Sequence, residues 1–153
     1  MIRVHATCVS VSGAGLLLRG PSGSGKSDLA LRLIDAGARL VADDQVMLQS
    51  ADGVLTAMAP QRLAGLIEVR GLGILPAPAV DSAPLRLVVD LMADPASVPR
   101  LPEPAAVVLE GVTLPRVALW SFAPSAPAAL RLALSALLAG RPLVPADFEQ
   151  VAA

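Results

Sequence analysis

The chain has 153 residues, the length of one domain, and its formal net charge of −1 gives no electrostatic signature of nucleic-acid binding. Aromatic residues make up 2% of the sequence, so few side chains could stack on exposed bases. The single cysteine, Cys8, cannot form an internal disulfide, and no run reaches about 18 uninterrupted apolar residues, so we expect neither a secreted disulfide scaffold nor a membrane span. These properties predict a cytoplasmic protein of one domain, residues 1–153, with no nucleic-acid or membrane partner.

The hydrophobic fraction of 54% is high for a soluble monomer. A subunit interface would cover the excess apolar surface, which favours a homo-oligomer. The alternative is that small residues, mainly alanine and valine, raise the fraction without any interface.

Strand, loop and helix signals follow one another at the start of the chain. Apolar and β-branched runs at residues 4–11 and 16–19 predict two strands, joined by a turn at residues 12–15. Residues 27–36 predict an amphipathic helix that ends at Gly37, a residue typical of helix C-termini. Its apolar face consists of Leu29, Ala30, Leu33 and Ile34.

The segment between the second strand and this helix fits the phosphate-binding P-loop pattern GxxxxGK[ST] at every fixed position. It reads Gly20-Pro21-Ser22-Gly23-Ser24-Gly25-Lys26-Ser27 and contains the only lysine of the chain. In such a loop the backbone N–H groups at the helix N-terminus hold phosphate oxygens, the lysine reaches the terminal phosphates and the serine hydroxyl coordinates Mg²⁺. The motif predicts nucleotide or pyrophosphate binding; the alternative is a chance glycine turn before a helix.

The remaining pattern is rich in strands and closes with a helix, which predicts an α/β fold. We find no internal repeat and no disordered tail. Proline-dense loops are expected at residues 76–84 and 95–104. Further strands are expected at residues 39–42, 46–48, 54–58, 66–69, 85–91, 107–109 and 117–119, the second and third forming a hairpin, and a helix at 128–139 before Gly140.

Two adjacent carboxylates, Asp43 and Asp44, follow the apolar strand at residues 39–42. This is the end at which α/β sheets place their ligands. Because neighbours on a strand point to opposite faces, one aspartate could face bound phosphates while the other fixes the loop. A solvated Asp-Asp turn is the alternative.

Residues 67–74, Ile67-Glu68-Val69-Arg70-Gly71-Leu72-Gly73-Ile74, extend the pattern beyond the P-loop. Together with His5, the loop at 20–27 and Val41-Ala42-Asp43-Asp44, they closely resemble the catalytic domain of bacterial HPr kinase/phosphorylase. Order and spacing fit from His5 to about Arg116, roughly three quarters of the chain.

The resemblance implies an α/β fold of the phosphoenolpyruvate carboxykinase type and an enzyme that uses ATP and Mg²⁺ to phosphorylate a serine of an HPr-like phosphocarrier protein of the phosphotransferase system. It also suggests a homo-oligomer such as a hexamer. Asp44 matches the general base, Glu68 the second Mg²⁺ ligand beside Ser27, His5 the catalytic histidine and Arg100 the catalytic arginine; Asp43, Arg70, Gly71 and Gly73 match supporting positions.

Two of these positions have plainer interpretations. Glu68 and Arg70 are two apart on an extended segment, so they could share a face and form a structural ion pair with each other. His5, on a strand near the chain end, could be a packed or solvated side chain.

The sequence departs from the family in two places. His5 already occupies the catalytic histidine position, so we expect the family's N-terminal regulatory domain to be absent. Residues 121–127, Ser121-Phe122-Ala123-Pro124-Ser125-Ala126-Pro127, replace a proline–arginine–glycine–asparagine segment tied to dephosphorylation. Without those donors an extra phosphate lacks charge-assisted hydrogen bonds, so we expect phosphorylase activity to be weak or lost.

Two other functions remain open on the same scaffold. One is a small-molecule kinase, because a P-loop, a carboxylate base and a Mg²⁺ ligand could serve any alcohol. The other is a nucleotide-sensing module with little turnover. The presence of Lys26, Ser27, Asp44 and Glu68 favours an enzyme, since a pure binding module needs no base.

Overall fold

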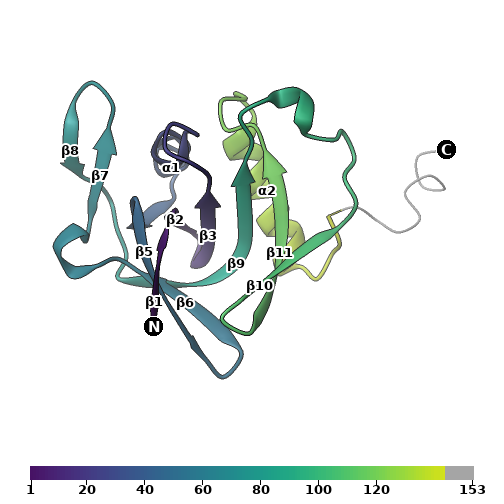
Figure 1. Ribbon diagram of the computed structural model, residues 1–153, viewed down its shortest axis with the longest axis horizontal. Coiled ribbons are helices and arrows are strands. Elements are labelled where there is room, and N and C mark those ends of the chain that lie inside the picture. Colours follow the sequence, from purple (N-terminus) through teal and green to yellow (C-terminus); the bar gives the residue numbers. More distant parts are fainter. Residues whose placement is uncertain (144–153) are drawn as a thin grey trace.

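A nine-stranded mixed sheet is the frame of the computed structural model, which describes residues 1–143 (Figure 1). The expectation of no disordered tail falls partly on residues 144–153, which lie outside the described residues. The strands of this sheet are β1 (Ile2–His5), β2 (Thr7–Val11), β3 (Ala14–Arg19), β4 (Arg39–Ala42), β5 (Gln45–Ala51), β6 (Val54–Met58), β9 (Ser82–Leu91), β10 (Ala105–Leu109) and β11 (Val112–Leu119). They run in the order β1-β5-β6-β9-β3-β2-β4, with β11 on β9 and β10 on β11.

Two neighbouring pairs of strands in the sheet, β3–β9 and β9–β11, are parallel, with β9 in the middle. All the other pairs are antiparallel. Parallel strands bring their carboxyl ends to the same edge, and β3 leads there directly into residues 20–27. The fold therefore delivers the glycine loop to the edge where α/β sheets bind ligands.

The expected first strand is split in the structure. The run at residues 4–11 predicted one strand, but β1 pairs with β5 whereas β2 pairs with β3 and β4. The change of partner occurs at Ala6, which is fully buried and donates its N–H to the Asp44 carbonyl at 3.2 Å. A continuous apolar run cannot indicate that its two halves belong to different parts of a sheet.

A separate two-stranded sheet stands beside the main one, formed by β7 (Leu66–Val69) and β8 (Gly73–Pro76) (Figure 1). We did not predict β8, because its four residues show no alternation of apolar and polar types. All four are exposed in the structure. The chain reversal has positive φ at Gly71 in the turn, +87°, and at Gly73, the first residue of β8, +128°, and glycine adopts such values without a steric penalty.

The predicted loop at residues 76–84 was wrong at both ends. Pro76 completes β8, and β9 already begins at Ser82. Pro84 lies inside β9, next to Thr56, at the point where β9 changes its partner from β6 to β3. A proline, which has no N–H to donate, is tolerated where the ladder is interrupted in this way. The bounds of β4, β6 and β7 are as predicted, whereas β3, β5, β10 and β11 are longer than the runs predicted at residues 16–19, 46–48, 107–109 and 117–119.

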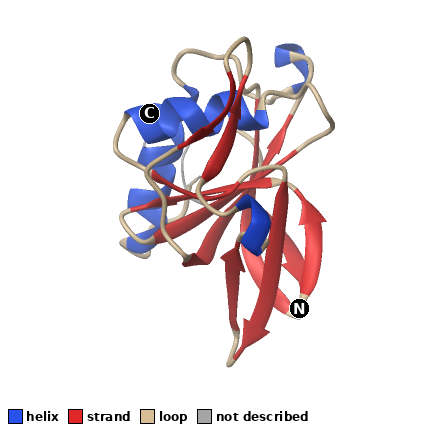
Figure 2. Ribbon diagram, turned by 90° about the vertical axis from the view of Figure 1, so that its left-hand side faces the viewer, coloured by secondary structure: helices blue, strands red, loops and turns tan. Residues whose placement is uncertain are grey.

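Two α-helices, α1 (Lys26–Asp35) and α2 (Ala126–Leu138), pack against one apolar cluster of the sheet. The short 3-10 helices η1 (Gln61–Leu63) and η2 (Pro95–Ser97) lie in connections (Figure 2). In β3, Leu16 and Leu18 join the cluster that includes the helices, while Leu17 joins a second cluster. Burial on both faces explains why β3 is a continuous apolar run. Neither α-helix is long and apolar enough to cross a membrane.

Charged side chains join the three parallel strands near their carboxyl ends. Asp90 of β9 accepts hydrogen bonds from Arg19 of β3, at 2.8 and 2.9 Å, and from Nε of Arg116 of β11. Burial alone would raise the pKa of Asp90, but the hydrogen bonds and charges of the two arginines outweigh it, so the pKa lies below its usual value.

We predict that Asp90→Asn lowers the free energy of unfolding at neutral pH by about 2 kcal/mol, because charged hydrogen bonds are lost. Since the folded pKa of Asp90 lies below the unfolded value of about 3.9, the stabilisation is complete above that pH and disappears as the pH falls through the folded pKa. Urea unfolding over this range measures the difference, with Asp52→Asn in the exposed β5–β6 turn as control. A difference independent of pH would contradict the assignment.

The same substitution at two leucines of α2 tests which face of the helix is buried. Leu130 is 1% exposed and Leu132 is 74% exposed. Leu130→Ala should lower the free energy of unfolding by about 2–5 kcal/mol, whereas Leu132→Ala should change it by less than about 0.5 kcal/mol. Denaturant unfolding measures both, and equal effects would contradict the packing of α2 on the sheet.

Candidate active site

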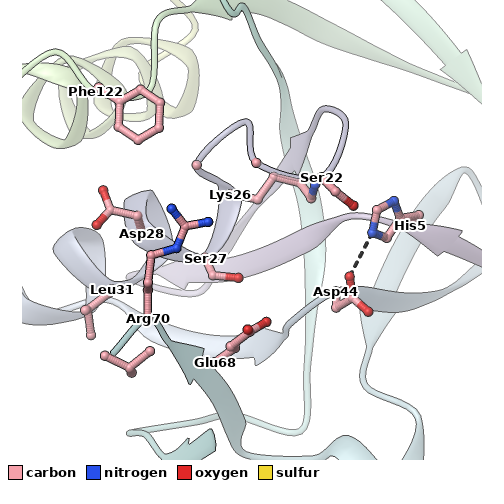
Figure 3. A pocket seen from close by; sticks show the side chains of 13 residues that line it. His5, Ser22, Lys26, Ser27, Asp28, Leu31, Asp44, Glu68, Arg70 and Phe122 are labelled. Atoms are coloured by element: carbon pink, nitrogen blue, oxygen red, sulfur yellow. Dashed lines mark hydrogen bonds and ion pairs between the residues drawn. The ribbon is translucent and has the colours of Figure 1, made fainter. Parts of the chain in front are cut away.

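A cavity of about 310 Å³ opens at the carboxyl edge of the parallel strands (Figure 3). Its walls come from the glycine loop and the first two turns of α1, from residues 68–70 of the β7 end, and from three side chains of other segments, His5, Asp44 and Phe122. The elements that meet here are far apart in the sequence, so the tertiary fold assembles the cavity.

The glycine loop, residues 20–27, has a conformation that requires its glycines. Gly23 and Gly25 have φ of +84° and +93°, in the left-handed region. A Cβ on Gly20 would lie 2.5 Å from Ser24 Oγ, and one on Gly25 would lie 2.4 Å from Ser121 Oγ. The loop turns with Ser24 N–H donating to the Pro21 carbonyl at 3.0 Å, and α1 begins at Lys26. The N-terminal end of α1, with its free N–H groups, therefore lies within this loop.

Lys26 is buried, with 7% of its surface exposed, and its side chain folds back onto the loop. The ammonium donates to the carbonyls of Gly20, at 2.6 Å, and Pro21, at 3.1 Å. Burial is the main effect on its pKa and lowers it, while the negative charges of Asp44 and Asp43 oppose that shift. The loop thus holds a cation on the wall of the cavity.

Asp43 and Asp44 occupy very different environments although they are neighbours. Asp43 is 6% exposed and accepts hydrogen bonds from Thr7 Oγ1 at 3.0 Å, Ser27 Oγ at 2.7 Å and the Glu68 N–H at 2.9 Å. Its carboxylate thereby joins β2, α1 and β7. The buried Asp43 therefore stabilises the fold, whereas its neighbour Asp44 lines the cavity.

Asp44 lines the cavity and adopts a left-handed backbone conformation, φ +68°, which aspartate tolerates better than most residues. Its Oδ1 lies 2.7 Å from His5 Nε2 (Figure 3). A carboxylate can only accept a hydrogen bond, so Nε2 carries the proton. The two side chains are 62% and 50% exposed, so the pair adds little stability and mainly orients the carboxylate.

Glu68 and Arg70 both line the cavity from the β7 end. Within residues 1–143 they form no ion pair with each other, so the alternative of a structural Glu68–Arg70 ion pair does not hold. Figure 3 shows the Arg70 guanidinium pointing into the cavity. Beyond them, Gly71 lies in the β7–β8 turn and Gly73 is the first residue of β8.

Of the four predicted catalytic residues, Arg100 is the one that does not line the cavity. It is exposed, lies in the connection between β9 and β10, and is not among the lining residues. Arg70 instead brings a guanidinium to the cavity wall.

Sequence reasoning missed the part played by residues 121–123, which lie against the glycine loop. Ser121 is fully buried, and its hydroxyl donates to the Ser24 carbonyl at 2.6 Å. Arg32 of α1 donates to the carbonyls of Ser121 and Ala123, the latter at 3.2 Å, and pairs with Asp28. Phe122 lines the cavity. The rarity of aromatic residues was the one sequence signal that could have drawn attention to it.

Two oxygen-bearing side chains on the cavity wall, Ser27 and Glu68, could contribute ligands to a magnesium ion. Within residues 1–143 no group of three or more His, Cys, Asp or Glu side chains could hold a metal ion by itself. Ser27 and Glu68 nevertheless place a hydroxyl and a carboxylate on the cavity wall. Magnesium prefers such oxygen ligands and usually takes the remaining ones from water and phosphates.

Comparison with known proteins gives relatives for this chain. The HPr kinase/phosphorylase of Clostridium novyi (strain NT) is 50% identical over 78 residues, which are 51% of this chain and 25% of that protein. The HPr kinase/phosphorylase of Clostridium acetobutylicum is 46% identical over 78 residues, 51% of this chain and 26% of that protein. The chain therefore spans about a quarter of the length of these relatives.

The fold also has a solved counterpart. The structure of the HPr(Ser) kinase/phosphatase from Coxiella burnetii matches with a TM-score of 0.80, covering 92% of this chain and 98% of that chain at 23% sequence identity. At this identity the match shows a shared mixed α/β fold.

A family-level match agrees with both comparisons. The HPr Serine kinase C-terminal domain family matches residues 1–83, a shorter stretch than the expected 5–116 but more than half of the chain. The matched stretch includes His5, the glycine loop, Asp43, Asp44 and residues 67–74, and it leaves out Arg100 and Phe122. The chain belongs to the HPr serine kinase C-terminal domain family.

Proposed function

We propose that this protein is an ATP-dependent kinase that phosphorylates a serine of an HPr-like phosphocarrier protein of the phosphotransferase system. The observation that carries the proposal is the placement of Lys26 and Asp44 on walls of one cavity, because it combines a phosphate-binding cation with a carboxylate base. Family membership supports the choice of reaction. A cytoplasmic location and a homo-oligomer, such as a hexamer, are part of the same proposal.

The glycine loop and Lys26 hold the phosphates of ATP in this scheme. Phosphoryl transfer depends mainly on positioning the reactants and neutralising charge on the transferred group. The N-terminus of α1 and the Lys26 ammonium offer positive charge, while Arg70 is a further cation on the wall. Ser27 and Glu68 would hold Mg²⁺, which supplies further neutralisation of the phosphate charge. Asp43 keeps the Ser27 hydroxyl in place.

Asp44 acts as the general base. It takes the proton of the substrate serine hydroxyl as the serine oxygen forms its bond to the terminal phosphorus and the bond to ADP breaks. His5, through its 2.7 Å hydrogen bond, orients the Asp44 carboxylate toward the acceptor. The exposure of both side chains allows a protein substrate to reach them from solvent.

The two other functions remain distinguishable. A small-molecule kinase on the same scaffold would phosphorylate a low-molecular-weight alcohol but no carrier. A nucleotide-sensing module would bind ATP and transfer phosphate to neither.

We predict that Asp44→Asn lowers phosphate transfer from labelled ATP to a purified HPr-like carrier by at least about 100-fold, because general-base catalysis contributes about 10²–10⁴-fold. Binding of ATP, measured by calorimetry, should change less than about threefold, because Asp44 is not part of the glycine loop. The matched control is Asp52→Asn in the β5–β6 turn, which should leave both quantities unchanged.

Equal labelling of the carrier by wild type and Asp44→Asn would show that the proposed base is wrong. Binding of ATP without labelling of any acceptor by the wild type would favour the nucleotide-sensing module instead.

We also predict little phosphorolysis. The Ser121 hydroxyl already donates its hydrogen bond to the Ser24 carbonyl, and the side chains of Phe122 and Ala123 have no hydrogen-bond donor for a second phosphate. Incubation of phosphoserine carrier with orthophosphate should therefore release phosphate much more slowly than the kinase reaction adds it. The HPr kinase/phosphorylase of Clostridium novyi serves as positive control. Comparable forward and reverse rates for this protein would contradict the prediction.

A further inference from the structure

Among the described residues, Phe122 is the only phenylalanine, tyrosine or tryptophan on the cavity wall. Its side chain belongs to the loop between β11 and α2, outside the stretch that matches the family. It is 50% exposed, which by itself means little, because single exposed apolar side chains are common in folded proteins. Two further observations point to a function: the ring is packed against the glycine loop, and it lines the same cavity as Lys26 and Asp44.

The ring is fixed against the glycine loop. A Cβ on Gly25 would lie 3.0 Å from the para carbon of Phe122, so the ring packs directly on that glycine. The preceding residue anchors the segment through the Ser121–Ser24 hydrogen bond. On another side, Trp120 contacts the ring edge-on, with centroids 6.2 Å apart and planes at 73°. An aromatic surface held in this way costs little ordering when a ligand stacks on it.

Phe122 lies at the opposite end of the cavity from the proposed base. In Figure 3, His5 and Asp44 occupy one end, Lys26 and Ser22 the middle, and Phe122, Asp28 and Leu31 the other end. A ligand with its phosphates at Lys26 and its terminal phosphate toward Asp44 therefore extends its remaining part toward Phe122 and Leu31. In a nucleotide, that part is the sugar and the base.

We propose that the Phe122 ring is the stacking surface for the base of the nucleotide, with Leu31 as a second apolar contact. This inference rests on the proposed nucleotide-dependent function. Stacking on an aromatic ring does not require a particular base, because every base has a π-face. Phe122 thus makes nucleotides bind more tightly than inorganic phosphate chains, while the glycine loop binds the phosphates that both kinds of ligand contain.

The test compares two ligands on the full chain by titration calorimetry: ADP, which has a base, and inorganic tripolyphosphate, which has none. Phe122→Ala should weaken ADP binding about tenfold, in line with the measured value of base–aromatic stacking, and change tripolyphosphate binding by less than about twofold. Phe122→Tyr keeps the ring and should bind both ligands like the wild type. Leu132→Ala, on the exposed face of α2, is the control and should leave both unchanged.

Three results would overturn the inference. Equal weakening of ADP and tripolyphosphate by Phe122→Ala would show that the ring only supports the loop. Unchanged ADP binding would show that the base lies elsewhere, and a raised KM for the carrier without any loss of ADP affinity would assign the ring to the protein substrate.

The fluorescence of Trp120, the single tryptophan of the chain, gives an independent readout, since a base stacked on Phe122 changes the surroundings of its edge-on neighbour. ADP should change this emission and tripolyphosphate should change it much less. A protein that binds ADP through Phe122 but labels no carrier would contradict the kinase proposal and support this inference. Failure of the wild type to bind any nucleotide would contradict both.

Discussion

The buried carboxylate of Asp43 is the interaction on which the site depends. It accepts hydrogen bonds from Thr7, Ser27 and the Glu68 N–H, and so fixes β2, the start of α1 and β7 to one another. Such a group is tolerated in the interior only because its hydrogen bonds are satisfied. Thr7 also accepts the Asp44 N–H at 3.3 Å, so the same contacts set the position of the neighbouring carboxylate.

The mixed topology of the sheet explains why the cavity lies where it does. The three parallel strands end at one edge, and Asp90 with its two arginines joins them there. The antiparallel strands bring β1 and the β4–β5 turn to the same region, which supplies His5 and Asp44. The glycine loop thus follows one of the parallel strands, and Asp44, the proposed base, comes from the antiparallel part of the sheet.

Local features of this fold could be predicted from the sequence because they depend on neighbouring residues. The helix α1 follows from its apolar spacing and Gly37, and the β5–β6 hairpin from Asp52-Gly53, both of which have positive φ. The exposed strand β8, the proline within β9 and the break at Ala6 could not be predicted in the same way. Each of them is set by a pairing partner elsewhere in the chain.

The glycine loop, the pair of aspartates and residues 67–74 could be found from the sequence alone, because they are short motifs with fixed spacing, and they indicated the family. The three-dimensional fold was needed to show which aspartate is buried, that His5 is hydrogen-bonded to Asp44 across 39 positions, and that Ser121 is hydrogen-bonded to Ser24 across 97. It also placed Phe122 on the cavity wall and left Arg100 outside. The physical reason is that hydrogen bonds and packing join residues whose separation in sequence carries no periodic signal.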